Sequence, residues 1–570
     1  AEASFADTFA ANAGVTSFNS NGFSLGVGSY GSTNGNNVTY ASWTFRKKEK
    51  FFDIVTYTGN GSARTISHGL NGPVGMILIK RISGTGNSNW ETFHRGQGPT
   101  KSGRLNNNTA FSNNASGGYW NSTAPTNSVF SIGTDGGVNS NGQTYIAYLF
   151  ADNSSEDAED QMIKCGSYTG TGSNLDVNLG WEPQFLLIKN STSAADWYIL
   201  DTMRGFTATT LSNELVNPNS ANAESKVGNV AYDQYLTSTG FRMLANASEF
   251  NTNGQTYIFM SIRAPLMVEP EAATDVFAID TRGSSAATAD GVVYHSNFPV
   301  DMTLARNIGS GGSMLAYNRS RADRGVFTNT TAAESSQGGH KWDSMHGFDV
   351  RTLSASTAQY AWMWKRAKGF MDVINYIGTG SARTLPHSLG VVPEMMWVRN
   401  LTTADSWQVY AAPLGNTKYI YLNENYFAGT NISRWNNTTP TASVITVGST
   451  DGVNRNTDRH TAYLFATLAG ISKCGSYTGN GSYQTISCGF SAGSRFVLIK
   501  RTDAVGDWYL WDSVRGISAG NDPHLSLNTN AGQVTNDDSI DPANSGFIVN
   551  QVSATNINVS SGTYIFYAIA

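Results

Sequence analysis

The sequence contains few charged residues and almost no cysteine. Asp, Glu, Lys and Arg make up 14% of its 570 residues, against about 25% in ordinary soluble domains. The formal net charge of −5 is too small to favour a phosphate-binding groove, so we expect no nucleic-acid partner. Three cysteines cannot form a disulfide framework. The fold must therefore be held by burial and backbone pairing.

Long apolar runs are also missing, and their absence predicts no membrane insertion. Residues 1–4 show neither the basic nor the apolar region of a signal peptide. Glycine is abundant, with 59 residues, and aromatic residues reach 11%. Asn, Ser and Thr are frequent, whereas Glu and Lys, which cover exposed helices, are scarce. This composition favours β-structure.

Four segments of the chain follow one pattern, which indicates internal repeats. Each begins with a tyrosine and a glycine-rich turn, continues to an apolar strand that ends in a basic residue, reaches a tryptophan and closes with an aromatic strand. Each repeat has about 95 to 105 residues, the size of one β-sandwich domain. The opening tyrosines are Tyr57, Tyr168, Tyr376 and Tyr477, and the tryptophans are Trp90, Trp197, Trp407 and Trp508.

The repeats alternate between types. The first and third share a Trp-Asn pair, the second and fourth share an Asp-x-x-Arg-Gly motif, and a third type lies between the pairs. The closing piece of that third type, near 360–373, recurs near 40–54, so we expect the chain to open inside a repeat with more repeats upstream. With types named A, B and C, the predicted domains are a half-C at 1–53, A1 at 54–152, B1 at 163–265, C at 275–371, A2 at 372–467 and B2 at 472–570.

The strand signals predict an all-β protein. Residues 144–150 are β-branched and aromatic and follow an Asn-Gly turn. Continuous apolar runs such as 496–499 suggest strands buried on both faces. Turn residues recur about every 8 to 12 positions, as in sandwiches, and no helical period competes. We therefore predict tandem antiparallel β-sandwich domains in an A-B-C super-repeat, stacked closely because the linkers are short.

Several residues could have a catalytic or ligand-binding role, but a structural role is favoured for each of them. Cys165 and Cys474 stand where A repeats carry aliphatic residues, so we expect small buried side chains, with a 474–488 disulfide as the lesser alternative. His68 and His387 precede buried strands without other ligand residues and are expected to be hydrogen-bonded turn residues.

The carboxylates give no recurring acid–base pattern. The Asp-x-x-Arg-Gly motifs at 201–205 and 512–516 favour an internal ion pair over catalysis, and carboxylates such as Glu91 and Asp201 are not duplicated across all repeats. The acidic linker at 152–161 lacks the spacing of a calcium loop and is expected to be solvated. The glycine-rich stretch at 309–313 lacks the Lys-Ser/Thr of a phosphate loop. We predict no catalytic residue, no metal and no cofactor.

Two tryptophans are the candidate ligand-binding residues. Trp120 and Trp435 stand among Asn, Ser and Thr residues, and an exposed indole flanked by amides is suited to stacking on a sugar ring. The competing interpretation, a tryptophan that covers the edge of the sandwich, is the more favoured one.

The order of these motifs resembles a family of repeat-containing virion structural and tail-fibre-like proteins of marine bacteriophages, including those of cyanobacteria. The likeness spans essentially the whole chain and implies a place on the outside of the virion, other virion proteins as partners and, by analogy with tail fibres, a trimer. It supplies no catalytic residues. The segments that carry it are 42–47, 51–61, 66–68, 120–126, 144–151, 165–170 and 275–280.

We therefore expect a non-enzymatic fibre or appendage that contacts host cell-surface polysaccharide. Neutral polar and aromatic residues suit glycan contact in sea water, where salt screens charges within a few ångströms, and repetition multiplies weak contacts. Two alternatives remain open: an architectural decoration, head fibre or connector without a ligand, and a polysaccharide depolymerase.

Overall fold

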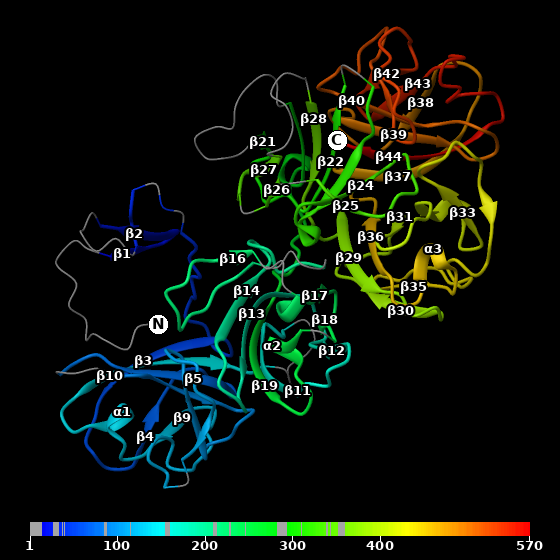
Figure 1. Cartoon of the computed structure of the whole chain (residues 1–570). Coiled ribbons are helices and arrows are strands. Elements are labelled where there is room, and N and C mark those ends of the chain that lie inside the picture. Colours follow the sequence, from blue (N-terminus) through cyan, green and yellow to red (C-terminus); the bar gives the residue numbers. More distant parts are fainter. Residues whose placement is uncertain are drawn as a thin grey trace. The chain divides into compact units, whose positions relative to one another are not determined.

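A computed structural model of the chain describes residues 14–26, 33–36, 38, 40–84, 88–114, 116–153, 160–208, 214–226, 230–245, 247–281, 293–308, 311–337, 340–342, 344–350 and 359–570. Strands account for 41% of the chain and helices for 5%, and the sheets are small and antiparallel (Figure 1). The predicted fold class, tandem antiparallel β-sandwiches in an A-B-C super-repeat, is confirmed. The described residues contain three α-helices of four residues each: α1 (Gly136–Asn139), α2 (Ser248–Asn251) and α3 (Asp451–Asn454).

The chain divides into two compact units. Unit 1 comprises residues 1–201, 214–233 and 243–263, and unit 2 comprises residues 202–213, 234–242 and 264–570. Unit 1 therefore holds the half-C, A1 and most of B1, whereas unit 2 holds C, A2 and B2. The two units are described separately below.

In unit 2 every sheet is built from strands of one repeat. C has a six-stranded sheet of order β20-β28-β22-β23-β24-β25, A2 has one of order β29-β36-β31-β32-β33-β34, and B2 has a five-stranded sheet of order β37-β44-β39-β40-β41. A smaller sheet of two or three strands accompanies each of them, namely β21-β27-β26, β30-β35 and β38-β43-β42.

The strand bounds of unit 2 follow the repeats closely. In C they are β20 (Phe277–Thr281), β21 (Tyr294–His295), β22 (Met302–Asn307), β23 (Leu315–Asn318), β24 (Arg324–Phe327), β25 (Ser335–Ser336), β26 (His340–Lys341), β27 (Gly347–Val350) and β28 (Gln359–Trp364). In A2 they are β29 (Met371–Ile377), β30 (Arg383–Pro386), β31 (Met395–Asn400), β32 (Gln408–Ala411), β33 (Lys418–Tyr421), β34 (Gly429–Thr430), β35 (Val444–Val447) and β36 (Arg459–Phe465). In B2 they are β37 (Ser472–Thr478), β38 (Gln484–Ser487), β39 (Phe496–Arg501), β40 (Trp508–Asp512), β41 (Leu525–Ser526), β42 (Ile540–Ala543), β43 (Gly546–Val549) and β44 (Thr563–Ile569).

Unit 1 repeats this plan with A1 and B1. A1 has the six-stranded sheet β3-β10-β5-β6-β7-β8 and the pair β4-β9, and B1 has the four-stranded sheet β11-β19-β13-β14. Among the described residues of the half-C are the hairpin β1 (Val15–Asn19) and β2 (Gly22–Leu25) and the segment that leads into β3. The other bounds are β3 (Phe52–Thr58), β4 (Arg64–Ser67), β5 (Val74–Arg81), β6 (Trp90–His94), β7 (Lys101–Arg104), β8 (Ser112–Asn113), β9 (Val129–Ile132), β10 (Thr144–Ala151), β11 (Ile163–Thr169), β13 (Pro183–Asn190), β14 (Trp197–Asp201) and β19 (Thr256–Arg263).

A buried asparagine explains the glycine-rich opening turn of the repeats. In A1 the hydroxyl of Tyr57 donates to the carbonyl oxygen of Val138 at 2.7 Å, and the side chain of Asn139 accepts from the backbone N–H of Asn60 at 2.9 Å. These bonds tie the opening turn to the loop before the closing strand and satisfy polar groups that burial would otherwise penalise. The equivalent pairs are Tyr168 and Asn251, Tyr376 and Asn454, and Tyr477 and Asn558.

The apolar strands are buried on both faces, as their sequences predict. Side chains alternate across a strand, and in β31 Met395 and Trp397 enter one hydrophobic core while Met396 and Val398 enter another. The first core collects side chains from C, A2 and B2 together, whereas the second belongs to A2 alone. We call the first one the shared core of unit 2.

Three repeats close around the shared core through indole hydrogen bonds. The Nε1–H of Trp407 in A2 donates to the carbonyl oxygen of Phe327 in C at 2.9 Å, and that of Trp508 in B2 donates to Tyr421 in A2 at 2.8 Å. A third bond links C to B2: the Nε1–H of Trp362 in C donates to the buried carboxylate of Asp512 in B2 at 3.0 Å. The three sandwiches of unit 2 therefore share one apolar interior and are linked to one another by hydrogen bonds.

Candidate functional site

The two candidate sugar-binding tryptophans are buried. Trp120 is 1% exposed and packs edge-on against Phe93. Trp435 is 0% exposed, packs edge-on against Tyr410 and donates its indole N–H to the carbonyl oxygen of Lys418 at 3.0 Å. The stacking hypothesis assumes exposed indoles, whereas both indoles lie in the apolar core of their own repeat.

The amide-rich flanks of these tryptophans have a conformational cause. Asn121 and Ser122 both have positive φ angles, 50° and 46°, and Asn436 and Asn437 repeat them at 52° and 48°. Asparagine tolerates this left-handed region better than most residues. The polar residues after each indole therefore occupy a tight turn.

The cysteines are structural. Cys165 and Cys474 are buried, and all three cysteines are free. Cys474 lies in the shared core, whereas Cys488 lies in the core of B2 alone, so the considered 474–488 disulfide is absent. Burial raises the pKa of the Cys488 thiol to about 12, which keeps it protonated and unreactive near neutral pH.

Both turn histidines behave as the sequence predicts. The ring Nδ1 of His68 accepts from the backbone N–H of Leu70 at 3.3 Å, and that of His387 accepts from Leu389 at 3.2 Å. Burial lowers the pKa of both rings, so the neutral form that accepts these bonds is favoured.

The Asp-x-x-Arg-Gly motif forms the expected ion pair in B2. The carboxylate of Asp512 accepts from Nε of Arg515 at 2.5 Å and from the indole of Trp362, and neither Asp512 nor Arg515 is exposed to solvent beyond 1% of its side chain. In unit 1, Asp201 accepts from the indole of Trp43 at 3.0 Å. The carboxylates of this motif therefore join a B repeat to a C repeat.

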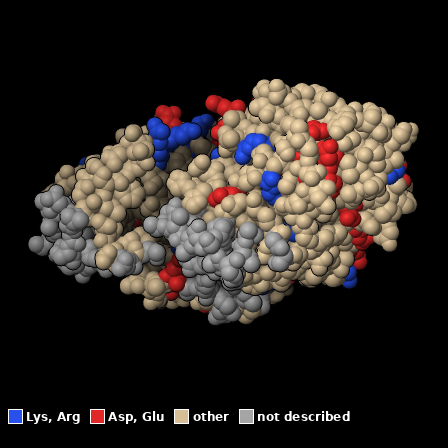
Figure 2. Space-filling view, turned by 90° about the horizontal axis from the view of Figure 1, so that it is seen from above, with Lys and Arg blue, Asp and Glu red and all other residues tan. Residues whose placement is uncertain are grey.

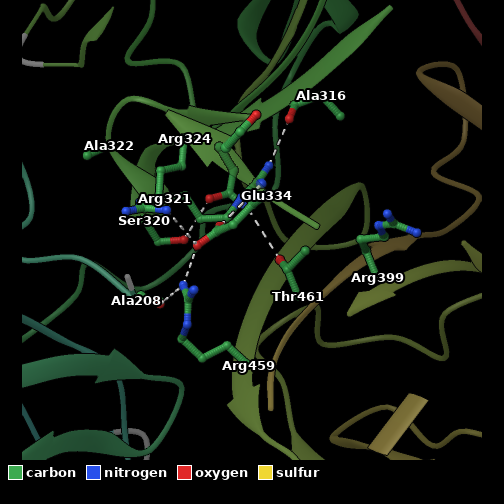
Figure 3. A network of polar contacts seen from close by, with 12 residues as sticks. Ala208, Ala316, Ser320, Arg321, Ala322, Arg324, Glu334, Arg399, Arg459 and Thr461 are labelled. Atoms are coloured by element: carbon green, nitrogen blue, oxygen red, sulfur yellow. Dashed lines mark hydrogen bonds and ion pairs between the residues drawn. The ribbon is translucent and has the colours of Figure 1, made fainter. Parts of the chain in front are cut away.

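A second polar cluster joins C to A2 (Figure 3). The buried carboxylate of Glu334 lies 3.9 Å from guanidinium nitrogens of Arg321 and Arg324 and is paired with Arg459. Arg321 comes from the 3₁₀ turn after β23, Arg324 from β24 and Arg459 from β36. The backbone N–H of Glu334 also donates to the carbonyl oxygen of Leu401 at 3.1 Å.

This Glu334 network is a specialised version of a general junction. The same backbone hydrogen bond links Phe111 to Ser191 between A1 and B1, and Ala428 to Thr502 between A2 and B2. Neither of those junctions has a glutamate at the matching position, so the charge cluster distinguishes one junction and does not recur as a catalytic group would. Sequence reasoning missed it because Arg459 lies far along the chain from Arg321, Arg324 and Glu334.

Glu91 in A1 is, like Asp522 in B2, a carboxylate whose pKa is raised to about 7, as that of a general acid would be. Burial raises its pKa to about 7, with the charge of Arg104 acting in the opposite direction. Its counterpart in A2 is Gln408, which pairs with Arg434 through a neutral amide. A position that tolerates an amide in the other A repeat points to a structural contact.

No group of three or more His, Cys, Asp or Glu side chains among the described residues is arranged to hold a metal ion. No helix in the described part of the chain has the length and apolarity needed to cross a bilayer. On the face seen in Figure 2, charged side chains form small separate groups among uncharged residues.

A family model for a domain of unknown function, DUF7483, matches residues 1–264 and 279–570. The chain belongs to the DUF7483 family. The break between the two matched stretches of this DUF7483 protein, residues 265–278, covers the linker before C and the first residues of C, so the second stretch contains the rest of C together with A2 and B2. No curated protein matches the sequence.

Proposed function

We propose that this DUF7483 protein is a non-enzymatic structural protein of a bacteriophage particle, located outside the virion as a tail fibre or similar appendage that contacts the host surface. The shared core is the observation that carries this proposal. Three sandwiches that bury one common interior and exchange indole hydrogen bonds behave as a stiff body, which suits a part that transmits load between a particle and a cell.

The chemistry of the buried groups supports a passive role. Asp512 is paired with Arg515 of its own repeat and accepts the indole N–H of Trp362 of C. Glu334 lies among arginines of C and A2. The similarity of motif order to phage tail-fibre-like proteins supports the same conclusion. Contact with host polysaccharide would rest on uncharged polar surface and on avidity across repeats.

The proposal is tested by labelling the particle that carries this protein. Antibodies raised against the purified chain are expected to decorate the tail or another external appendage in electron micrographs and to slow adsorption to host cells. Particles that contain the protein but show no external label would contradict the proposal.

An architectural role without a ligand is the second candidate. It is favoured by the burial of Trp120 and Trp435, which removes the two proposed sugar-stacking surfaces. A glycan array probed with the purified chain separates the two roles: saturable binding to host polysaccharide supports attachment, and its absence together with capsid labelling supports decoration. No cofactor, metal or catalytic residue enters either role.

A further inference from the structure

The junction between A2 and B2 in unit 2 is fixed by two backbone hydrogen bonds. The N–H of Ala428 donates to the carbonyl oxygen of Thr502 at 3.0 Å, and the N–H of Gly506 donates to the carbonyl oxygen of Asn425 at 3.0 Å. The two residues between Asn425 and Ala428 are therefore held against B2 from both ends, opposite the loop between β39 and β40.

Two other junctions have the same pair of bonds but enclose small residues. The corresponding bonds join Phe111 to Ser191 and Ala195 to Asn108 between A1 and B1, and Glu334 to Leu401 and Asp405 to Thr331 between C and A2. The enclosed residues are Thr109 and Ala110 in A1 and Ala332 and Ala333 in C. In A2 they are two aromatic residues, Tyr426 and Phe427. The turn itself therefore needs no aromatic side chain at either position.

Both rings lie at the surface. Tyr426 is 59% exposed and Phe427 is 55% exposed, and neither belongs to the shared core or to the core of A2 alone. Val505, in the loop on the opposite side of the junction, is 56% exposed. Scattered exposed apolar residues are ordinary, whereas a group that backbone pairing holds together is informative. We call Tyr426, Phe427 and Val505 the A2–B2 patch.

The polar groups beside the A2–B2 patch suit an uncharged ligand. The side chain of Asn425 makes no hydrogen bond to another described residue, and an amide can both donate to and accept from a hydroxyl group. The two basic residues of the B2 strand are engaged elsewhere. The buried ammonium of Lys500 donates to the carbonyl oxygen of Gly506, and Arg501 pairs with Asp503 at 3.0 Å. An anionic ligand would find both of these cations already paired.

The size of the patch decides between a protein and a smaller ligand. Aromatic side chains have about 150–250 Å² of surface each, so two half-exposed rings and a valine present roughly 250 Å². A standard protein interface needs about 800 Å² from each partner. The patch is therefore too small for a stable protein interface, and it matches the face of one or two sugar rings.

We propose that the A2–B2 patch is a binding site for a neutral polysaccharide of the host surface. The inference rests on the proposed function in host contact and adds the place where that contact is made. The C–H face of a sugar ring is weakly positive and packs on the negative face of an aromatic ring, here Tyr426 and Phe427. The amide of Asn425 is placed to bond the hydroxyl groups of the sugar.

The test replaces the two rings by the residues that A1 carries. Tyr426→Thr combined with Phe427→Ala gives A2 the native pair of A1, so the turn is expected to form as it does there. The 570-residue chain and this double variant are titrated on an array of neutral and acidic bacterial surface polysaccharides. We expect the unsubstituted chain to bind neutral polysaccharides saturably and the double variant to bind them about tenfold or more weakly, since two stacking contacts are lost.

Two single variants act as controls. Tyr483→Ala removes a tyrosine of similar exposure, 61%, from the opening turn of B2 and is expected to leave binding unchanged. Asn425→Ala keeps both rings and both backbone hydrogen bonds of the junction. It is expected to weaken binding about threefold or more, as the loss of one hydrogen bond does. Hydrogen exchange of β33 and β40 checks that each variant keeps its fold.

The results separate the site from the function. Equal binding of neutral polysaccharides by the unsubstituted chain and the double variant would overturn the site and leave host attachment standing. No saturable binding by the unsubstituted chain would overturn both. Binding of acidic polysaccharides alone, or an equal loss in Tyr483→Ala, would overturn the proposal as stated.

A second copy of the protein is the competing occupant of the patch. Sedimentation of the unsubstituted chain and of the double variant tests for it. A monomer in both cases is expected. A dimer that Tyr426→Thr with Phe427→Ala abolishes would assign the patch to self-association and overturn the proposal.

Discussion

Trp90 in unit 1 and Trp407 in unit 2 occupy the same place in an A repeat, yet they have different surroundings. Trp407 is fully buried and hydrogen-bonded to C, whereas Trp90 is half-buried. Their own repeats are alike in strand order. The difference teaches that the burial of a side chain in this protein is set by the neighbouring repeat and not only by the repeat that contains it.

Truncating the two tryptophans should give the largest contrast. Trp407→Ala is expected to destabilise unit 2 by about 3–5 kcal/mol, since it removes a large buried side chain and leaves a cavity. Trp90→Ala is expected to cost unit 1 less than half as much, because its side chain is already partly solvated. Urea unfolding, read by hydrogen exchange of β32 and β6, measures both. Equal losses would show that the two sites are equally covered.

Removing the charge of Glu334 should also act on unit 2 alone. Glu334→Gln leaves the guanidinium of Arg321, which is 0% exposed, without its counter-charge, and breaking a buried pair costs about 3–5 kcal/mol. The exposed carboxylate of Asp451 is the control, and Asp451→Asn is expected to change the free energy of unfolding by less than about 0.5 kcal/mol. A neutral outcome for Glu334→Gln would contradict a role in joining C to A2.

The stability of A1 should depend on pH through Glu91, whereas A2 has a glutamine at the same position. Its pKa lies near 7 in the folded protein because burial raises it from 4.5. The folded state therefore holds a proton that the unfolded state has lost between these values, so this contribution to stability is complete below pH 4.5 and is lost as the pH rises to about 7. The loss is at most about 3 kcal/mol.

Glu91→Gln is expected to abolish this loss and to stabilise unit 1 at pH 8. The reference is A2, where the native Gln408 stands at the same position and produces no such slope. Thermal unfolding at pH 5 and pH 8 measures the effect. Asp522, whose pKa is also raised to about 7, lies in unit 2, so the unfolding of unit 1 is followed by itself. A wild-type slope of unit 1 that survives in Glu91→Gln would assign the titration to another group.

The smallest contrast concerns the ion pair at the start of each A repeat. Lys47 pairs with Asp53 at 2.7 Å but is 63% exposed, whereas Arg366 pairs with Asp372 at the same distance and is 20% exposed. Lys47→Ala is expected to cost less than about 1 kcal/mol, as exposed pairs do. Arg366→Ala is expected to cost more, and the reverse order in urea unfolding would refute the comparison.

Much of the fold could be read from the sequence because its signals are local. Turn residues, aromatic strands and the repeated tyrosines identify strands and repeats without knowledge of their neighbours. The internal ion pair of Asp512 and Arg515 could also be predicted, since the two residues are three positions apart. The burial of Trp120 and Trp435 was predicted only as the competing interpretation, because asparagine after an indole is equally typical of a turn and of a polar surface.

The sequence alone determined the β-sandwich class, the repeat types and their order, since strand alternation and turn chemistry act over a few residues. Only the tertiary structure decided that Met395 and Met396, adjacent in one strand, enter different cores, and that Glu334 meets arginines from two repeats. The reason is physical. Both faces of a central strand are apolar, so the sequence pattern indicates that each face is buried. Which repeat covers a given face depends on packing between segments that are distant along the chain.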